Sequence, residues 1–169
     1  MDFLELAKAR WTCRSYDARP VEQDKVDKLI EAMRLAPTAK NLQPQHIWVL
    51  TSEEALARVR TTTPCTYGAP LVFIIAYDPK AAYTRDDGKN FGEIDSSIVG
   101  THLILEAEQL GLGGTWIGAY DAALLRETFP ELAGFTDVGL FAIGYPAADA
   151  APAPRHEESR PIDELVSYL

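Results

Sequence analysis

The pattern of apolar and polar residues predicts a long central helix from Ile94 to Leu110, about 25 Å long at 1.5 Å per residue. Its apolar residues form two stripes. The first contains Val99, Leu103, Ala107 and Leu110, and the second contains Ile94, Ile98 and Leu105. A surface helix needs only one apolar stripe to cover a core. Two stripes therefore predict that one face meets the chain's own core and the other meets a second body, with a buried helix in a monomer as the alternative.

A glycine-rich break and a short strand follow this helix. Gly111, Gly113 and Gly114 are expected to end it, because glycine adopts the left-handed conformation common after a helix. Thr115–Gly118 is predicted to be a strand at the edge of a pocket.

The remaining pattern predicts further helices, strands and loops. Helices are expected over 2–10, 22–35, 53–60 and 121–129, with capping boxes at Asp2–Glu5 and Thr51–Glu54. Strands are expected over 46–51, 71–77 and 137–144, loops over 36–45 and 78–92, and an extended tail over 147–154. The loop over 78–92 is interpreted as exposed or as a short lid. Because helices and strands do not strictly alternate, the predicted fold class is α+β: one domain over 1–169, with a central mixed or antiparallel sheet flanked by helices.

Composition excludes several classes of protein. The 169 residues carry a formal net charge of -9, which argues against binding to nucleic acid or to an anionic membrane. No apolar run is long enough to cross a bilayer, and the acidic N-terminal sequence does not resemble a signal peptide, so a cytoplasmic protein is expected. The two cysteines and three histidines are too scattered to predict a disulfide framework or a metal site.

The motif search finds no side-chain catalyst. The sequence GLGGTWIG resembles a dinucleotide fingerprint, but Trp116 occupies the place of the third glycine and the glycines follow a helix instead of a strand. No nucleophile–base pair stands out.

Scattered residues nevertheless predict a site for an anion and a flat ring. Arg10 and Arg14 could clamp a phosphate, with Thr12 adding a hydroxyl and Arg160 a third cation. The amides of Asn41 and Gln43 could hydrogen-bond the edge of a heterocycle, and Trp116 could be a pocket wall. The alternatives are surface arginines, ordinary turn chemistry, a solvated tail residue and a core tryptophan.

These residues carry a resemblance to the nitroreductase superfamily of FMN-dependent oxidoreductases over nearly the whole chain. An arginine-rich segment resembles Arg10–Tyr16, and the family's proline–amide loop resembles Pro37–Pro44. An aspartate-led helix that ends in Gly-Leu-Gly resembles Asp95–Gly113. The Gly-Tyr-Pro turn and the later basic residue before proline resemble Gly144–Pro146 and Arg160-Pro161.

The resemblance implies a homodimer with FMN at the subunit interface, the second stripe of the central helix packing against the partner. It places the FMN phosphate and ribityl end on the N-terminal segment and the last arginine: Arg10, Trp11, Thr12, Arg14 and Arg160. It brings the partner subunit's loop to the flavin through Pro37, Thr38, Ala39, Asn41 and Gln43. It lines the ring with Trp116, Ile117 and Gly118.

The resemblance also implies the reaction. Hydride would pass from NADH or NADPH to flavin N5 and then to a small electron-poor acceptor, such as a nitroaromatic compound or a quinone, by a ping-pong mechanism. The alternatives are an FMN-binding or redox-partner module without NAD(P)H turnover, and a flavin-cleaving or other divergent member. One departure from the family concerns His156–Ser159, where many members have basic residues.

Overall fold

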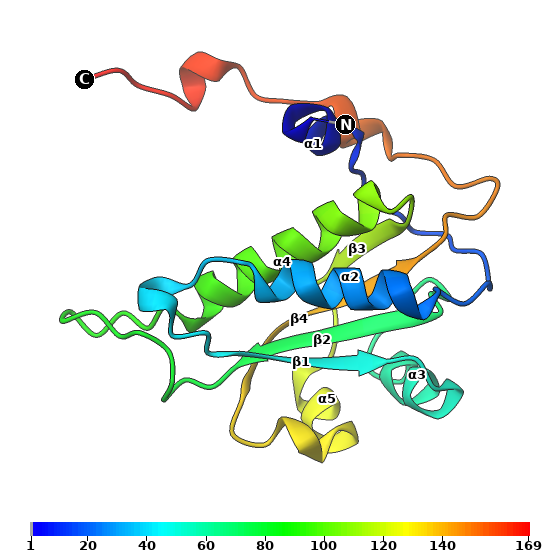
Figure 1. The fold of residues 1–169 in the computed structure, drawn as a ribbon, viewed down its shortest axis with the longest axis horizontal. Helices are drawn as coiled ribbons and strands as arrows, with labels where there is room; N and C mark the ends of the chain where they lie inside the picture. Colours follow the sequence, from blue (N-terminus) through cyan, green and yellow to red (C-terminus); the bar gives the residue numbers. More distant parts are fainter. Residues whose placement is uncertain (1) are drawn as a thin grey trace.

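The computed structural model describes residues 2–169, and within them a four-stranded antiparallel sheet lies between two layers of helices (Figure 1). The strands are β1 (Gln45–Leu50), β2 (Leu71–Tyr77), β3 (Gly113–Ile117) and β4 (Thr136–Gly144), in the order β1-β2-β4-β3. Every neighbouring pair is antiparallel. The predicted α+β sandwich is therefore confirmed, and its sheet is antiparallel throughout these four strands.

Strand β2 explains why the core has two halves. Its side chains alternate between the faces of the sheet, and those of Phe73 and Ile75 join one core while those of Val72 and Ile74 join the other. Helices cover both faces, which is why the strand is apolar along its length (Figure 1). Helices α2 (Gln23–Arg34) and α4 (Gly92–Gln109) contribute to the first core, and α3 (Glu53–Arg60) and α5 (Ala122–Thr128) to the second.

The long helix α4 separates its two apolar stripes as the sequence pattern predicts. Val99, Leu103 and Ala107 are fully buried in the first core. On the second stripe Ile94 is 39% exposed, and Leu105 is only partly buried. The first stripe therefore faces the chain's own core. On the second stripe Ile98 is half-buried and packs against the same core, whereas Ile94 and Leu105 are left partly exposed in the single chain.

Helix termini confirm one predicted cap and correct another. Helix α1 (Phe3–Ala9) begins with the predicted capping box, in which the Asp2 carboxylate accepts the Glu5 N–H at 2.8 Å. The box at Thr51–Glu54 is wrong, because the cap of α3 is Ser52, whose hydroxyl accepts the Ala55 N–H at 3.2 Å. With Ser52 as the cap, the third helical residue is an alanine, which has no side-chain group to return the bond.

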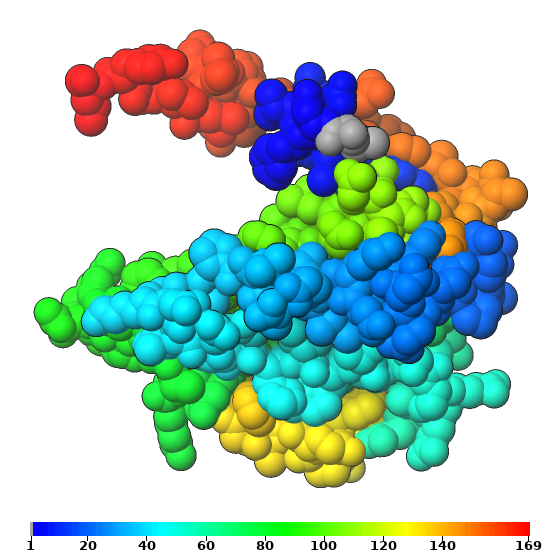
Figure 2. Space-filling view, in the orientation of Figure 1, coloured from blue at the N-terminus to red at the C-terminus, as the bar shows by residue number. Residues whose placement is uncertain are grey.

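The remaining short elements are 3-10 turns at Ala39–Asn41, Pro130–Leu132, Pro154–Glu157 and Ile162–Glu164. The first lies inside the predicted loop over 36–45. The last two lie in the C-terminal tail, which passes α1 and then projects beyond the body of the molecule (Figure 1). Figure 2 shows a concave opening between this tail and the layer formed by α2 and α4.

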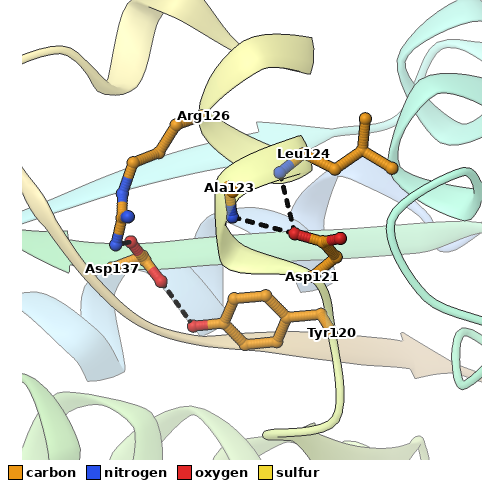
Figure 3. Close-up of polar contacts among 6 residues, drawn as sticks. All are labelled: Tyr120, Asp121, Ala123, Leu124, Arg126 and Asp137. Atoms are coloured by element: carbon orange, nitrogen blue, oxygen red, sulfur yellow. Dashed lines mark hydrogen bonds and ion pairs between the residues drawn. The ribbon is translucent and has the colours of Figure 1, made fainter.

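A polar cluster ties α5 to strand β4 (Figure 3). The Asp121 carboxylate caps α5 by accepting the backbone N–H groups of Ala123 and Leu124 at 3.0 and 2.9 Å. Asp137 on β4 receives the Tyr120 hydroxyl at 2.7 Å and the Arg126 guanidinium at 2.5 Å. Burial, and then the hydrogen bond to Asp137, raise the pKa of the Tyr120 phenol. The cluster fixes the chain just after β3, where part of the predicted site lies.

Candidate functional site

The N-terminal arginine segment is held in an extended conformation beside strand β3. The Cys13 N–H donates to the Gly114 carbonyl at 3.2 Å, and Thr12 forms a bridge with the same residue. The segment approaches so closely that a Cβ atom on Gly113 would lie 2.6 Å from the Cys13 Cβ. Because alternate residues of an extended chain share a side, this pairing places Arg10, Thr12 and Arg14 together.

These three side chains form one wall of a cavity of about 260 Å³. The other wall comes from the C-terminal tail, through Ala153, Arg155 and His156. The structure therefore brings together three residues that the sequence predicts for phosphate binding. It adds two cationic or ionisable groups that sequence reasoning missed.

The cavity is a positive site in an acidic protein. Three guanidinium groups and an imidazole line it, whereas the chain as a whole carries a formal charge of -9. The nearby acid is Glu108 on α4, where burial raises the pKa of the carboxyl and the charges of Arg10 and His156 lower it. Guanidinium forks and a hydroxyl are the donors that suit a phosphate group, so the donor set fits the phosphate of FMN.

Two residues predicted for the same end of the cofactor lie elsewhere in the described chain. The Arg160 Nε donates to Glu164 at 3.1 Å and its side chain is 65% exposed, so within residues 2–169 it does not line the cavity. Successive side chains of an extended segment point to opposite sides. The Trp11 side chain is therefore directed away from the wall that Arg10 and Thr12 form. A cofactor role for Trp11 and Arg160 stays a prediction.

The proline–amide loop is a strained turn held by its own hydrogen bonds. Lys40, Asn41 and Gln43 all have positive φ angles, of 54°, 54° and 50°, a conformation that residues other than glycine adopt at a cost. The Gln43 backbone N–H donates to the Thr38 hydroxyl at 3.0 Å. The Gln43 side-chain Nε2 donates to the side-chain amide oxygen Oδ1 of Asn41 at 2.9 Å. The loop thus presents two linked, exposed amides.

Asp95, in the first turn of α4, connects this loop to the core. Its carboxylate accepts the Ala39 N–H at 2.9 Å, and the residue is 2% exposed. Its second oxygen, Oδ2, has no hydrogen-bond partner within residues 2–169. From the sequence, Asp95 is identified as the aspartate that leads the family-like helix, but no role is assigned to its carboxylate. The sequence did carry a signal for this contact, because an acidic residue in the first turn of a helix beside buried positions often accepts a backbone N–H.

The residues predicted to line the flavin ring divide between the two faces of β3. Trp116 is 37% exposed and packs against Phe141, with ring centroids 4.9 Å apart. Ile117 is 2% exposed and packs in the second core, so its side chain lies on the other face of the sheet. Gly118 follows the end of the strand. Trp116 is thus the residue of this group whose side chain is available to a ligand.

Comparisons with known proteins identify the family. The nitroreductase family model matches residues 7–63 and 60–145. A protein of Methanothermobacter thermautotrophicus, provisionally named NADH dehydrogenase/NAD(P)H nitroreductase, is 30% identical over 156 residues, which cover 87% of this chain and 78% of that protein. A nitroreductase family protein from Clostridium difficile has 36% identity and a TM-score of 0.92, over 99% of this chain and 98% of that one.

This chain belongs to the nitroreductase family. A further structure with this fold is a provisionally named nitroreductase from Exiguobacterium sibiricum, solved in complex with FMN. It has a TM-score of 0.85 at 22% identity and covers 100% of this chain and 98% of that one. Among the described residues, no helix is long and apolar enough to span a membrane.

Proposed function

We propose that this protein is an FMN-dependent oxidoreductase that takes electrons from NADH or NADPH and delivers them to a small electron-poor acceptor, such as a nitroaromatic compound or a quinone. The observation that carries the proposal is the cavity where Arg10, Thr12 and Arg14 converge. Its guanidinium and hydroxyl donors suit the phosphate of FMN, and the chain belongs to the nitroreductase family. The names of the relatives, which include NAD(P)H nitroreductase, support the donor and the reaction class.

The protein's part in this reaction is to bind and orient. Arg10 and Arg14 hold the phosphate, the amides of Asn41 and Gln43 bond the polar edge of the ring, and Trp116 forms a wall beside it. The chemistry that bound FMN supplies is hydride transfer at N5, first from the nicotinamide and then to the acceptor, in ping-pong order. A nucleophilic side chain is not needed for such a reaction.

The geometry of α4 supports a site shared by two subunits. The amide loop is pinned at the N-terminal end of α4 by Asp95, and the arginine cavity lies near Glu108 at its C-terminal end. Those two residues are separated by roughly 20 Å along the helix. A twofold axis across α4 would bring the loop of one subunit to the arginines of its partner.

Exposed apolar surface also supports a homodimer. The tail carries apolar residues with little cover from the chain: Ile162, Leu165, Val166 and Tyr168 are 75%, 59%, 45% and 96% exposed. Ile94 and Leu105, on the second stripe of α4, are partly exposed as well. Apolar residues gathered on a projecting segment and on one helix face mark a protein–protein interface, and a second copy of the chain is the partner we propose.

The test starts with the purified protein and its absorbance spectrum. Bound FMN should give a yellow protein that NADH or NADPH bleaches under anaerobic conditions. Arg14→Ala should weaken FMN binding by roughly 1.5–3 kcal/mol, the range for a hydrogen bond to a charged group. A folded protein that binds no flavin after reconstitution would refute the proposal.

Steady-state kinetics test the ping-pong order. If donor and acceptor use the same flavin face in turn, double-reciprocal plots at several acceptor concentrations should be parallel. Intersecting lines would show that both substrates bind together. A flavin that is bound but never bleached by either nucleotide would favour an FMN-binding module without turnover.

A further inference from the structure

The C-terminal tail closes the arginine cavity through one 3-10 turn. Pro154–Glu157 forms this turn, in which the His156 N–H donates to the Ala153 carbonyl at 2.8 Å. His156 lines the arginine cavity and also a neighbouring cavity of about 460 Å³. Arg10 likewise lines both cavities. The turn thus places an arginine and a histidine opposite the N-terminal arginines, although 139 residues lie between Arg14 and Pro154 in the sequence.

We propose that Arg155 and His156 complete the phosphate site of the cofactor, in the role that the sequence pattern assigns to Arg160. The inference rests on the proposed FMN-binding function and names two of its ligands. Arg160, five residues beyond Arg155 in the tail, is paired with Glu164. Arg155 is exposed and lines the cavity itself.

The charges around His156 favour an anionic ligand. Lys8 and Arg10 face it from the end of α1, and Arg14 faces it across the cavity. Glu108 faces it from α4. On its own turn the flanking residues are Arg155 and Glu157. Four cations and two carboxylates therefore surround the imidazole.

The first experiment compares FMN with riboflavin, which has the same ring and no phosphate. Apoprotein is titrated with each flavin, and the ratio of the two affinities measures what the phosphate contributes. Arg155→Ala should lower FMN affinity roughly ten- to a hundredfold, as expected for losing a charge-assisted hydrogen bond, and should change riboflavin affinity less than about twofold. Arg60→Ala, which removes a cation on α3, is the control.

Arg160→Ala separates the two assignments of the third cation. If Arg155 holds the phosphate, Arg160→Ala should leave the FMN-to-riboflavin ratio near that of the wild type. A loss in Arg160→Ala together with an unchanged ratio in Arg155→Ala would overturn the inference. Because Arg155 is exposed, its removal leaves no buried gap, and thermal melting of the apoproteins checks that each variant is folded.

The second experiment repeats both titrations, at one fixed pH, in the wild type and in His156→Gln. The ratio of FMN affinity to riboflavin affinity should fall several-fold in His156→Gln, because the imidazole that lines the arginine cavity is lost. An unchanged ratio would overturn the role of His156.

The outcomes also distinguish this inference from the proposed function. A wild type that binds neither flavin would refute both. A wild type that binds FMN tightly, with no effect of Arg155→Ala or His156→Gln, would refute the inference and leave the proposed function standing.

Discussion

At the scale of single residues, Asp95 is the group through which helix α4 controls the shape of the amide loop. Residues such as Lys40, Asn41 and Gln43, held in the left-handed region, cost about 1–3 kcal/mol each. One hydrogen bond to a charged group contributes about 1.5–3 kcal/mol, so Asp95 offsets the strain of about one such residue. The bonds between Thr38, Asn41 and Gln43 must offset part of the remainder.

Removing the Asp95 carboxylate should therefore destabilise the protein measurably. Asp95→Ala leaves the Ala39 N–H without its acceptor and should lower the free energy of unfolding by about 1.5–3 kcal/mol. Asp95→Asn keeps an acceptor oxygen and should cost less. Urea denaturation at a fixed protein concentration measures both, with Asp149→Ala as the control for loss of an exposed acid. An Asp95→Ala midpoint equal to that of the wild type would contradict a pinning role.

Ionisation of Tyr120 should lower the stability of the folded protein at alkaline pH. Its phenol has a raised pKa in the folded state, against about 10 when unfolded, so the folded state holds the proton more tightly. The resulting stabilisation is present below pH 10 and is lost as the pH rises through the folded-state pKa. Between pH 9 and 11 the melting temperature should fall more steeply for the wild type than for Tyr120→Phe.

Tyr16 also has a raised pKa, but it is retained in both of these proteins and cancels in the comparison. Tyr168→Phe, which changes a side chain in a 96% exposed residue, is the control and should follow the wild type. Parallel melting curves for the wild type and Tyr120→Phe would show that ionisation of Tyr120 does not limit stability at alkaline pH.

At the scale of elements, the sequence predicts a helix or strand correctly where a single local pattern specifies it. The apolar run Leu71–Tyr77 can only be a strand covered on both faces, and β2 is such a strand. The pairing of Thr12 and Cys13 with Gly114 could not be predicted, because it joins segments about a hundred residues apart and no pattern in either segment specifies the partner. That pairing is what aligns Arg10 and Arg14; the residues alone left open whether they form a clamp or are two surface arginines, and the family resemblance favoured the clamp.

The contact between α4 and β4 makes a second element-scale prediction. A Cβ atom on Gly100 would overlap the Phe141 ring. Alanine is favoured over glycine in a helix by up to about 1 kcal/mol, whereas overpacking a core costs about 1–3 kcal/mol. Gly100→Ala should therefore be destabilising on balance.

The matched variant is Gly100→Ala combined with Phe141→Leu. The smaller side chain makes room for the added methyl group, so the double variant should be more stable than the sum of the two single changes predicts. Thermal and urea unfolding measure this coupling. A Gly100→Ala protein more stable than the wild type would show that the helix can move away from β4 at little cost.

At the scale of the whole molecule, the single chain shows which stripe of α4 is free, a question that the sequence left open. Both stripes are apolar, and only the tertiary structure shows that Leu103 is fully buried and that Leu105 lies on the partly exposed face. The sequence also did not show which arginine of the tail supplies the third cation of the phosphate site. Arg155 lies within one 3-10 turn of the tail and Arg160 precedes the next, and which of them reaches the cavity depends on how the tail folds back.

Opposite outcomes are expected for a charge placed on each stripe. Leu103→Glu buries a carboxylate in the first core and should unfold the chain. Leu105→Glu should leave a folded monomer that has lost FMN. Circular dichroism and light scattering distinguish the two, with Gln109→Glu adding the same charge at an exposed position of α4. A Leu105→Glu protein that remains dimeric would show that this stripe is not in the interface.

A site shared between subunits predicts complementation between two defective proteins. One variant, Arg10→Ala with Arg14→Ala, lacks the phosphate clamp, and the other, Asn41→Ala with Gln43→Ala, lacks the loop amides. Each homodimer should have low NAD(P)H-dependent activity at limiting FMN. If every site takes its arginines from one subunit and its amides from the other, each mixed dimer contains one wild-type site and one site with both defects. Random exchange makes about half of the dimers mixed, so about a quarter of the wild-type activity should return. Refolding the two variants together, with a refolded mixture of tagged and untagged arginine variant as the control, measures the recovery. Mixed dimers that form without regaining activity would show that the arginines and amides of each site belong to the same chain.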